Sequence, residues 1–203
     1  MARARRGVRG LSLVELMVAS VLVLLLMGEV WMMLRAGTRF YLRVKSQTET
    51  QRSALIALRW LSKDLAESSP NSFRHYDPTY HIPTVHDGFV FGSLKDESEE
   101  IIYNEDSKIL WTTVTCYYID PVSHVLYRTK KPQADPGITA PKIKDADHHI
   151  DILAGLEKRR PIAHHVKDIE SVLGPKNVKI TLRCRDEELG YGLTVSTRLE
   201  MKN

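Results

Sequence analysis

The chain has 203 residues, of which 43% are hydrophobic and 27% are charged, and its formal net charge is +4 at pH 7. A chain of this length forms one domain, or one domain with an anchor. The first ten residues contain four arginines and no acid, so they carry the whole net charge and the remainder is neutral. The charge therefore gives no support for a protein that binds nucleic acid or acidic lipid, and we expect no nucleic-acid partner.

An apolar segment, residues 11–34, follows directly after the basic leader at residues 1–10. A helix of about 20 apolar residues crosses a bilayer, so this segment is predicted to be a single transmembrane helix. The residues that interrupt it are Ser12, Glu15, Ser20, Gly28 and Glu29. An ionised side chain in hydrocarbon costs several kcal/mol and persists only with a partner, so Glu15 needs an explanation.

Residues 9–15, which read Arg-Gly-Leu-Ser-Leu-Val-Glu, resemble the leader and processing site of type IV pilins and the related pseudopilins. The resemblance implies that a membrane-embedded prepilin peptidase cleaves after Gly10 and methylates the new amino group of Leu11. Mature members of the family usually begin with Phe, so Leu11 departs from the pattern. Cleavage after Gly7 would put Ser12 in the place of the acid, and only Gly10 fits. Because the cut precedes the apolar run, the helix stays with the mature protein.

The resemblance also implies a role for Glu15 in the assembly of subunits into a filament. The amino group of Leu11 is a cation at the end of an apolar helix, and a neighbouring subunit's Glu15 neutralises it where the low dielectric makes the attraction strong. The alternative is that Glu15, within two turns of the helix end, extends its carboxylate to the lipid headgroups. The implied partners are prepilin peptidase, other pilin or pseudopilin subunits, and the inner membrane.

The far end of the apolar segment carries Glu29 and Trp31. They are interpreted as an interfacial carboxylate beside an aromatic belt, and a second assembly contact is the alternative for Glu29. The basic residues that follow are Arg35, Arg39, Arg43 and Lys45. They flank this end as heavily as the leader flanks the other, so counting them does not orient the helix. A C-terminal domain on the periplasmic or extracellular side is implied by the resemblance.

Residues 35–68 are predicted to continue the helix as an amphipathic segment. The apolar residues at steps of four, three and four, typical of one helix face, are Ala54, Leu58, Leu61 and Leu65. The residues assigned to the other, exposed side are Arg59, Lys63, Asp64 and Glu67. Pro70 ends the helix, because proline disfavours helical geometry at the preceding residue. One helix over residues 11–68 would be about 85 Å long, with its outer half packed by one face on a globular domain.

Residues 69–203 are predicted to form a β-rich domain, which makes the fold class α+β. Alternation of apolar and polar residues predicts strands, and residues 121–123 and 190–192 read as hairpin turns. The predicted strands span residues 89–91, 100–103, 109–120, 124–129, 166–172, 178–184 and 193–199. Most of residues 130–161 is interpreted as a surface excursion, with a short helix over residues 150–156.

The aromatic and sulfur side chains of this domain are interpreted as core. The aromatic set, favoured as sheet core over a ligand platform, is Trp111, Tyr117, Tyr118 and Tyr127. The only cysteines, Cys116 and Cys184, give one possible disulfide in an oxidising compartment. Both lie on the apolar side of alternating strands and are expected to face one core. The alternative is two buried free thiols that pack as small apolar groups.

A looser resemblance extends into the C-terminal part. Residues 52–67, 117–118, 126–128 and 197–203 resemble the J-type minor pseudopilins of type II secretion and similar minor type IV pilins. Those proteins often end in Arg-Asn, where this chain ends in Lys-Asn. The resemblance implies a structural subunit near the tip of a pseudopilus or pilus, acting in filament assembly and protein secretion, with adhesion or DNA uptake as the alternative setting.

Catalytic and metal-binding patterns are poorly supported. The sequence has no G-x-S-x-G elbow, no glycine-rich phosphate loop and no Cys-His signature, so we expect no enzyme activity, no catalytic residue and no cofactor. The stretch 145–151, Asp-Ala-Asp-His-His-Ile-Asp, with His164 and His165 suggests a metal site by residue type. Its spacing fits neither a zinc nor a calcium motif, so a solvated polar loop is favoured. The rival class is a metal-binding or enzymatic domain tethered by one helix.

Overall fold

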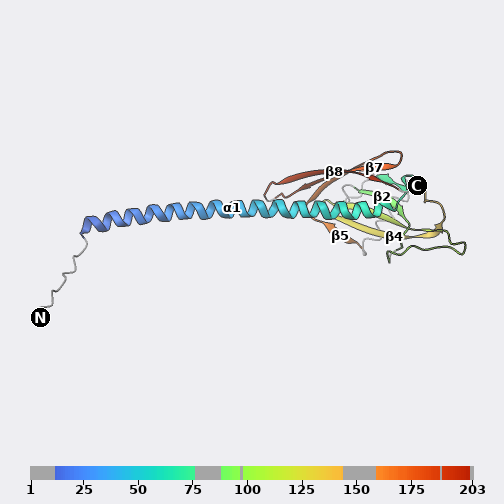
Figure 1. The fold of residues 1–203 in the computed structure, drawn as a ribbon, viewed down its shortest axis with the longest axis horizontal. Coiled ribbons are helices and arrows are strands. Elements are labelled where there is room, and N and C mark those ends of the chain that lie inside the picture. Colours follow the sequence, from blue (N-terminus) through green and yellow to red (C-terminus); the bar gives the residue numbers. More distant parts are fainter. Residues whose placement is uncertain (1–11, 76–87, 97, 144–158, 188, 202–203) are drawn as a thin grey trace, which may run out of the picture. The chain divides into compact units, whose positions relative to one another are not determined.

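The computed structural model describes residues 12–75, 88–96, 98–143, 159–187 and 189–201 (Figure 1). The chain divides into two compact units, residues 1–44 and 45–203. Gly10 and Leu11 lie outside the described residues, as does the helix predicted over residues 150–156.

A single helix, α1 (Leu13–Ala66), accounts for the first half of the prediction. It ends two residues before the predicted position, and the short 3-10 helix η1 (Pro70–Ser72) begins at the proline that was expected to stop it. In the first unit every described residue of α1 is exposed. This stretch contains an 18-residue window of mean hydropathy 2.3, so α1 is long and apolar enough to cross a membrane.

In the second unit α1 buries one face. The buried residues are Ser46, Thr50, Ala54, Ala57, Leu61, Asp64 and Leu65. Apart from the adjacent pair Asp64 and Leu65, they recur at steps of three and four, which confirms the predicted helical stripe. Two details differ from the prediction: Leu58 is half-buried while Ala57 is fully buried, and Asp64 belongs to the buried face. The small Ala57 lets the helix approach the sheet, and Asp64 is buried because a cation lies opposite it.

Two antiparallel sheets complete the second unit. The five-stranded sheet has the order β1-β2-β3-β4-β5, and the three-stranded sheet has the order β6-β7-β8. The strands of the first are β1 (Arg74–His75), β2 (Gly88–Ser93), β3 (Trp111–Asp120), β4 (Val125–Gly137) and β5 (Arg160–Ala163). Those of the second are β6 (Val166–Leu173), β7 (Asn177–Arg185) and β8 (Gly192–Glu200). The predicted α+β fold, a long apolar helix followed by antiparallel sheets, is confirmed.

The predicted strands at 89–91, 109–120, 124–129, 166–172, 178–184 and 193–199 correspond to β2, β3, β4, β6, β7 and β8. Residues 100–103 form only isolated bridges, Lys95 with Ile101 and Tyr103 with Ile109. The surface excursion predicted over residues 130–161 is wrong at both ends, because β4 continues to Gly137 and β5 begins at Arg160. The extension of β4 was not predicted because Pro132 and Pro136 argue against a strand. A register shift, from Thr113–Pro132 to Trp111–Gly137, lets the ladder pass them without backbone donors.

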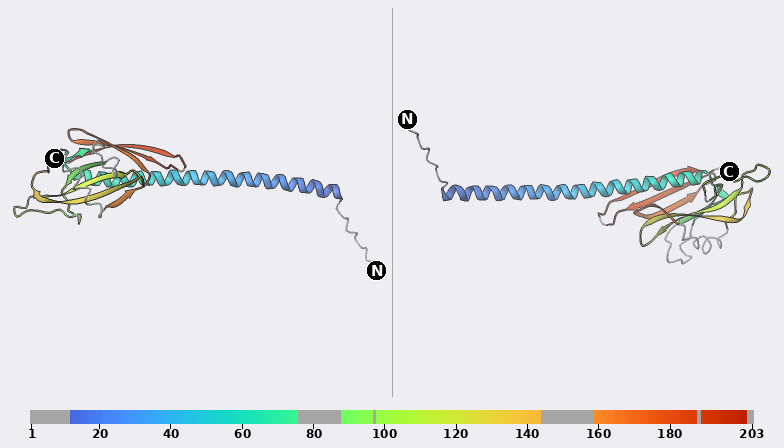
Figure 2. Two further views of the ribbon diagram at one scale, coloured as in Figure 1. Left: turned by 180° about the vertical axis from the view of Figure 1, so that it is seen from behind. Right: turned by 90° about the horizontal axis from the view of Figure 1, so that it is seen from below.

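The main core lies between α1 and both sheets. Figure 2 shows from two further sides that the C-terminal part of α1 runs against the strands. Its aromatic centre is a stack of Phe73, Phe89, Phe91 and Tyr117, with ring centroids 5.4–6.5 Å apart. A smaller cluster of Val90, Cys116, Tyr118 and Ile143 is separate from it. Consecutive residues of β3 therefore feed different clusters, as strand geometry requires.

Candidate functional site

The candidate site is the first turn of α1, where Ser12 and Glu15 form a reciprocal pair. The backbone N–H of Ser12 donates to Glu15 Oε2 at 2.9 Å, and the backbone N–H of Glu15 donates to Ser12 Oγ at 3.3 Å. This is a capping box, which satisfies two amides that the start of a helix leaves without partners. The acid that the sequence singles out is thus held at the start of its own helix. The spacing Ser-x-x-Glu was the available signal for this role of Ser12.

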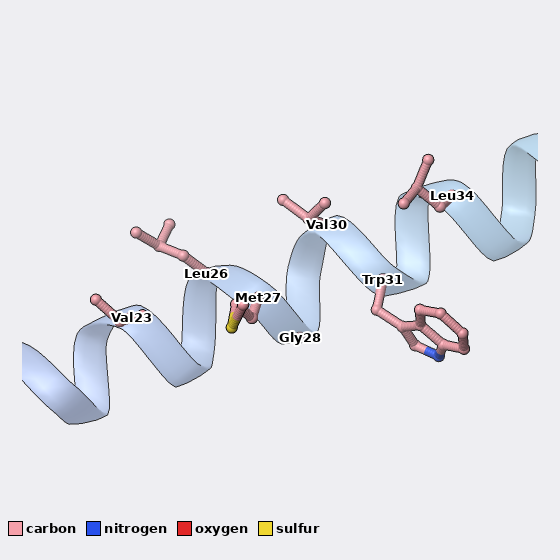
Figure 3. Close-up of a pocket in the computed structure, with 7 residues that line it drawn as sticks. All are labelled: Val23, Leu26, Met27, Gly28, Val30, Trp31 and Leu34. Atoms are coloured by element: carbon pink, nitrogen blue, oxygen red, sulfur yellow. The ribbon is translucent and has the colours of Figure 1, made fainter.

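Exposed apolar side chains surround this turn and continue along the helix. Within the first unit all large hydrophobic residues from Leu13 to Leu34 are more than half exposed. Figure 3 shows a shallow apolar hollow further along, where Gly28 leaves an opening beside Trp31. A Cβ at Gly28 would meet no atom within 4 Å. The residues that line the hollow are Val23, Leu26, Met27, Gly28, Val30, Trp31 and Leu34. An apolar surface of this kind fits lipid or another helix.

A second cluster of charged groups lies buried between α1 and the sheet. Asp64 accepts from Arg128 Nε at 2.6 Å, from Arg128 Nη2 at 3.0 Å and from the Tyr117 hydroxyl at 2.6 Å. The side chains of Asp64 and Arg128 are 5% and 6% exposed. Burial, reinforced by the Asp64 charge, raises the pKa of Tyr117 well above its usual value, so the phenol stays a donor. The cluster joins α1 to β3 and β4.

Glu99 extends the same cluster toward the surface. It accepts from Arg128 Nη2 at 2.8 Å and lies 3.0 Å from the Lys130 ammonium. Burial alone would raise the pKa of Glu99, but hydrogen bonds and charges from Arg128 and Lys130 lower it to about 2. Trp60 closes the cluster, with the Arg128 guanidinium 5.0 Å and the Arg160 guanidinium 4.6 Å from its ring centre. Each charged group of the cluster contacts another of its members, so we interpret the cluster as structural: it holds α1 on the five-stranded sheet.

Ser46, near the start of the packed part of α1 (residues 45–66), holds the helix to the turn between β7 and β8. Its hydroxyl donates to Asp186 Oδ2 at 2.5 Å, and both residues are buried. Asp186 also ties the turn between β7 and β8, because its Oδ1 accepts from the backbone N–H of Leu189 at 3.2 Å. Neither this contact nor the one between Asp64 and Arg128 was predicted, since the partners are more than 60 residues apart in sequence.

The two cysteines are free thiols in the structure, so the alternative of two buried thiols is the one found. Cys184 belongs to the main core, whereas Cys116 lies in the smaller cluster with Val90 and Tyr118. The expectation that both face one core is wrong, because Cys116 lies next to Tyr117 on β3 and alternates away from it. Burial raises the pKa of Cys116 to about 12 and that of Cys184 to about 11, which keeps both protonated.

The predicted polar loop is only partly visible. Residues 145–151 lie outside the described residues, while His164 and His165 form the turn between β5 and β6. The backbone carbonyl of His165 accepts from the N–H of Arg185 at 2.8 Å. Among the described residues, no group of three or more His, Cys, Asp or Glu side chains is placed to hold a metal ion.

Comparison with protein-family models, curated proteins and solved structures finds no match to this chain. A function is therefore inferred from the chain's own residues. Glu15 forms a capping box at the start of an exposed apolar helix. The C-terminal part of the same helix packs on a β-rich domain.

Proposed function

We propose that the chain is the precursor of a minor pilin or pseudopilin, a non-catalytic subunit of a membrane-anchored filament. The observation that carries the proposal is the spacing at the N-terminus. A basic leader ends in Gly10, and the only acid in the first 18 residues of the apolar run, Glu15, follows five residues later. The exposed apolar surface of α1 and the packed β-rich domain support it, because an anchored subunit needs both.

Cleavage after Gly10 gives Glu15 a partner. The new terminus is the amino group of Leu11, which stays cationic when it is methylated. An ionised carboxylate in hydrocarbon is costly unless an opposite charge reaches it, and the low dielectric makes that attraction strong. The terminal amine of an adjacent subunit supplies the charge. Apolar contact between helices provides cohesion, and the ion pair fixes the register of one subunit on the next.

The β-rich domain, residues 69–203, is displayed on the periplasmic or extracellular side of the inner membrane. We place the subunit near the filament tip, where it contacts sister minor subunits. In a type II secretion system such a filament acts in the transport of folded protein across the outer membrane. In a type IV pilus the same subunit acts in initiation of the fibre, in adhesion or in DNA uptake.

The mass of the protein extracted from membranes tests the proposal. We expect the loss of Met1–Gly10 and the gain of one methyl group on Leu11. Gly10→Val should keep the leader attached, because the residue before the cut must be small. Gly7→Val is the matched control and should be processed normally. An intact N-terminus in the wild-type protein of working assemblies contradicts the proposal.

A further inference from the structure

An arm of the β-rich domain, residues 100–110, carries apolar side chains in solvent. The connection runs from β2 toward β3, and a bridge between Tyr103 and Ile109 places these two side chains on one face. Its turn is closed by backbone hydrogen bonds between Asn104 and Lys108 and between Ser107 and Asn104. The large exposed apolar residues of the arm are Ile101, Ile102, Tyr103 and Ile109, of which Tyr103 is 56% exposed. Four exposed large apolar side chains on one short arm mark it as a contact surface.

The same arm is acidic. Glu100, Glu105 and Asp106 are all exposed. The only ion pair of the arm among the described residues is the loose one between Asp106 and Lys108, at 4.0 Å with both side chains more than half exposed. Exposed pairs of this kind contribute little, so the arm presents a negative potential around an apolar centre.

A surface of the opposite charge lies on the outer side of α1. The basic stripe consists of Arg52, Leu55, Ile56 and Arg59, all exposed, with Leu55 at 67%. Steps of three and four residues place them on one helix face, opposite the face that packs on the sheets. No ion pair of Arg52 or Arg59 occurs within the described part of the chain. Two guanidinium groups, without an ion pair to any described residue, thus flank two exposed aliphatic side chains.

The arm and the stripe lie at different heights along α1. Glu99, the residue before the arm, lies with its Oε2 3.3 Å from Lys63 Nζ. Lys63 is one helical turn after Arg59 on α1. The centre of the stripe, Leu55 and Ile56, lies about seven residues earlier, or about 11 Å at 1.5 Å per residue. The exposure of Leu55 shows that the arm of the same chain leaves the stripe uncovered.

We propose that the acidic arm of one copy docks on the basic stripe of a second copy of this chain. The two surfaces match in charge and each has an apolar centre, and both are present on one molecule. Because different surfaces meet, the contact is heterologous, and a pair of copies keeps one arm and one stripe free for adjoining subunits of the filament. The inference rests on the proposed function in that a filament needs such a contact, and it names the residues that make it.

Site-specific cross-linking in membranes tests this contact with the full chain. A photo-reactive phenylalanine analogue replaces Tyr103, and the protein is expressed beside a second, differently tagged copy. We expect a cross-link from position 103 to the tryptic peptide Ser53–Arg59 of the other copy. The same probe at Val122, which is 88% exposed in the turn between β3 and β4, is the control and should not label that peptide.

Charge reversal tests the electrostatic match. Arg59→Glu removes a trypsin site, so the cross-linked peptide becomes Ser53–Lys63. Its yield should fall at least threefold, and adding Glu105→Arg to the same chain should restore it, since the two charges exchange places. A link only to other proteins or to other parts of the second copy, or no link at all, overturns the inference. If the leader is removed but no cross-link forms, the contact between arm and stripe is wrong and the proposed function stands. If the cross-link forms between copies that keep Met1–Gly10, the proposed function is wrong and the contact stands.

Discussion

Two stretches of one helix, residues 13–44 and 45–66 of α1, follow different rules. The first exposes every side chain, and its apolar residues surround the helix axis. The second buries a residue at every third or fourth step and exposes charged groups opposite. A helix that is apolar all round needs lipid or other helices as its surroundings, whereas an amphipathic helix is stabilised by the domain on which it packs. Continuity of the backbone therefore does not mean that the helix has one role.

Polar residues sharpen the contrast. In the packed stretch Ser46 and Asp64 are buried and each has a strong partner from the sheets. In the exposed stretch the described hydrogen bonds of Glu15 are to Ser12, at the start of its own helix. A buried polar group without a partner costs about 1–3 kcal/mol, and an ionised one costs more. The packed stretch thus supplies partners for Ser46 and Asp64, although the hydroxyl of the buried Thr50 has none among the described residues. An ionised Glu15 in hydrocarbon would need an additional cation.

The largest effect is expected from Glu15→Ala. The variant should insert in the membrane and lose Met1–Gly10, but its recovery in sheared filaments should fall at least tenfold, because the amine of the adjacent subunit stays unpaired. Glu29→Ala removes the same charge from the same helix near its other end, and its recovery should stay within twofold of wild type. Normal incorporation of Glu15→Ala would remove the reason for treating the exposed stretch as an assembly surface.

Arg128→Ala should have the largest effect on the packed stretch. It leaves Asp64 buried without its cation, which costs about 3–5 kcal/mol in the free energy of unfolding of the β-rich domain. Urea unfolding of the full chain in detergent micelles, followed by near-ultraviolet circular dichroism of the stacked aromatic rings, measures the loss.

The matched control for this change is Arg183→Ala. Arg183 also contacts two carboxylates, Asp168 and Glu170, but its side chain is 49% exposed. Its removal should cost less than about 1 kcal/mol. Equal losses for the two arginines would mean that burial does not set the strength of these ion pairs.

Leu61→Ala compares the two stretches through an apolar residue. Leu61 is fully buried against the sheets, and its truncation should lower the stability of the domain by about 2–5 kcal/mol through lost contact and a cavity. Leu22→Ala, in the exposed stretch, should leave the same unfolding transition unchanged. A shift of the transition in Leu22→Ala would show that the exposed stretch contributes to the stability of the domain.

The sequence predicted most of the fold because it follows local periodicity. The helical steps of Leu61 and Leu65 and the alternation in β7 and β8 are visible in any window of ten residues. The continuation of β4 through Pro132 was missed, because a register shift of the partner strand, which lies elsewhere in the chain, makes room for the proline.

Asp64 and Cys116 show that local sequence patterns do not predict contacts between distant parts of the chain. Asp64 is buried because Arg128, 64 residues later, faces it, and charge alone assigned it to solvent. Cys116 and Cys184 both alternate with polar residues, but alternation does not say which side of a sheet meets which core. At the candidate site the acid was predicted from its unusual place in an apolar run. Its cap, Ser12, was missed although the spacing was present.

The smallest effect concerns Glu99, whose pKa in the folded state is about 2. A depressed pKa stabilises the folded state above the unfolded pKa of about 4.5, and the contribution disappears as pH falls from there toward 2. Since the side chain is one-third exposed, solvent screening limits the contribution to about 1 kcal/mol. The difference in urea midpoint between pH 7 and pH 3 should therefore be smaller in Glu99→Gln than in wild type. Glu105→Gln, on the exposed arm, is the control and should keep the wild-type difference. Equal differences in all three proteins would mean that the hydrogen bonds from Arg128 and Lys130 to Glu99 do not outweigh the burial of its carboxylate.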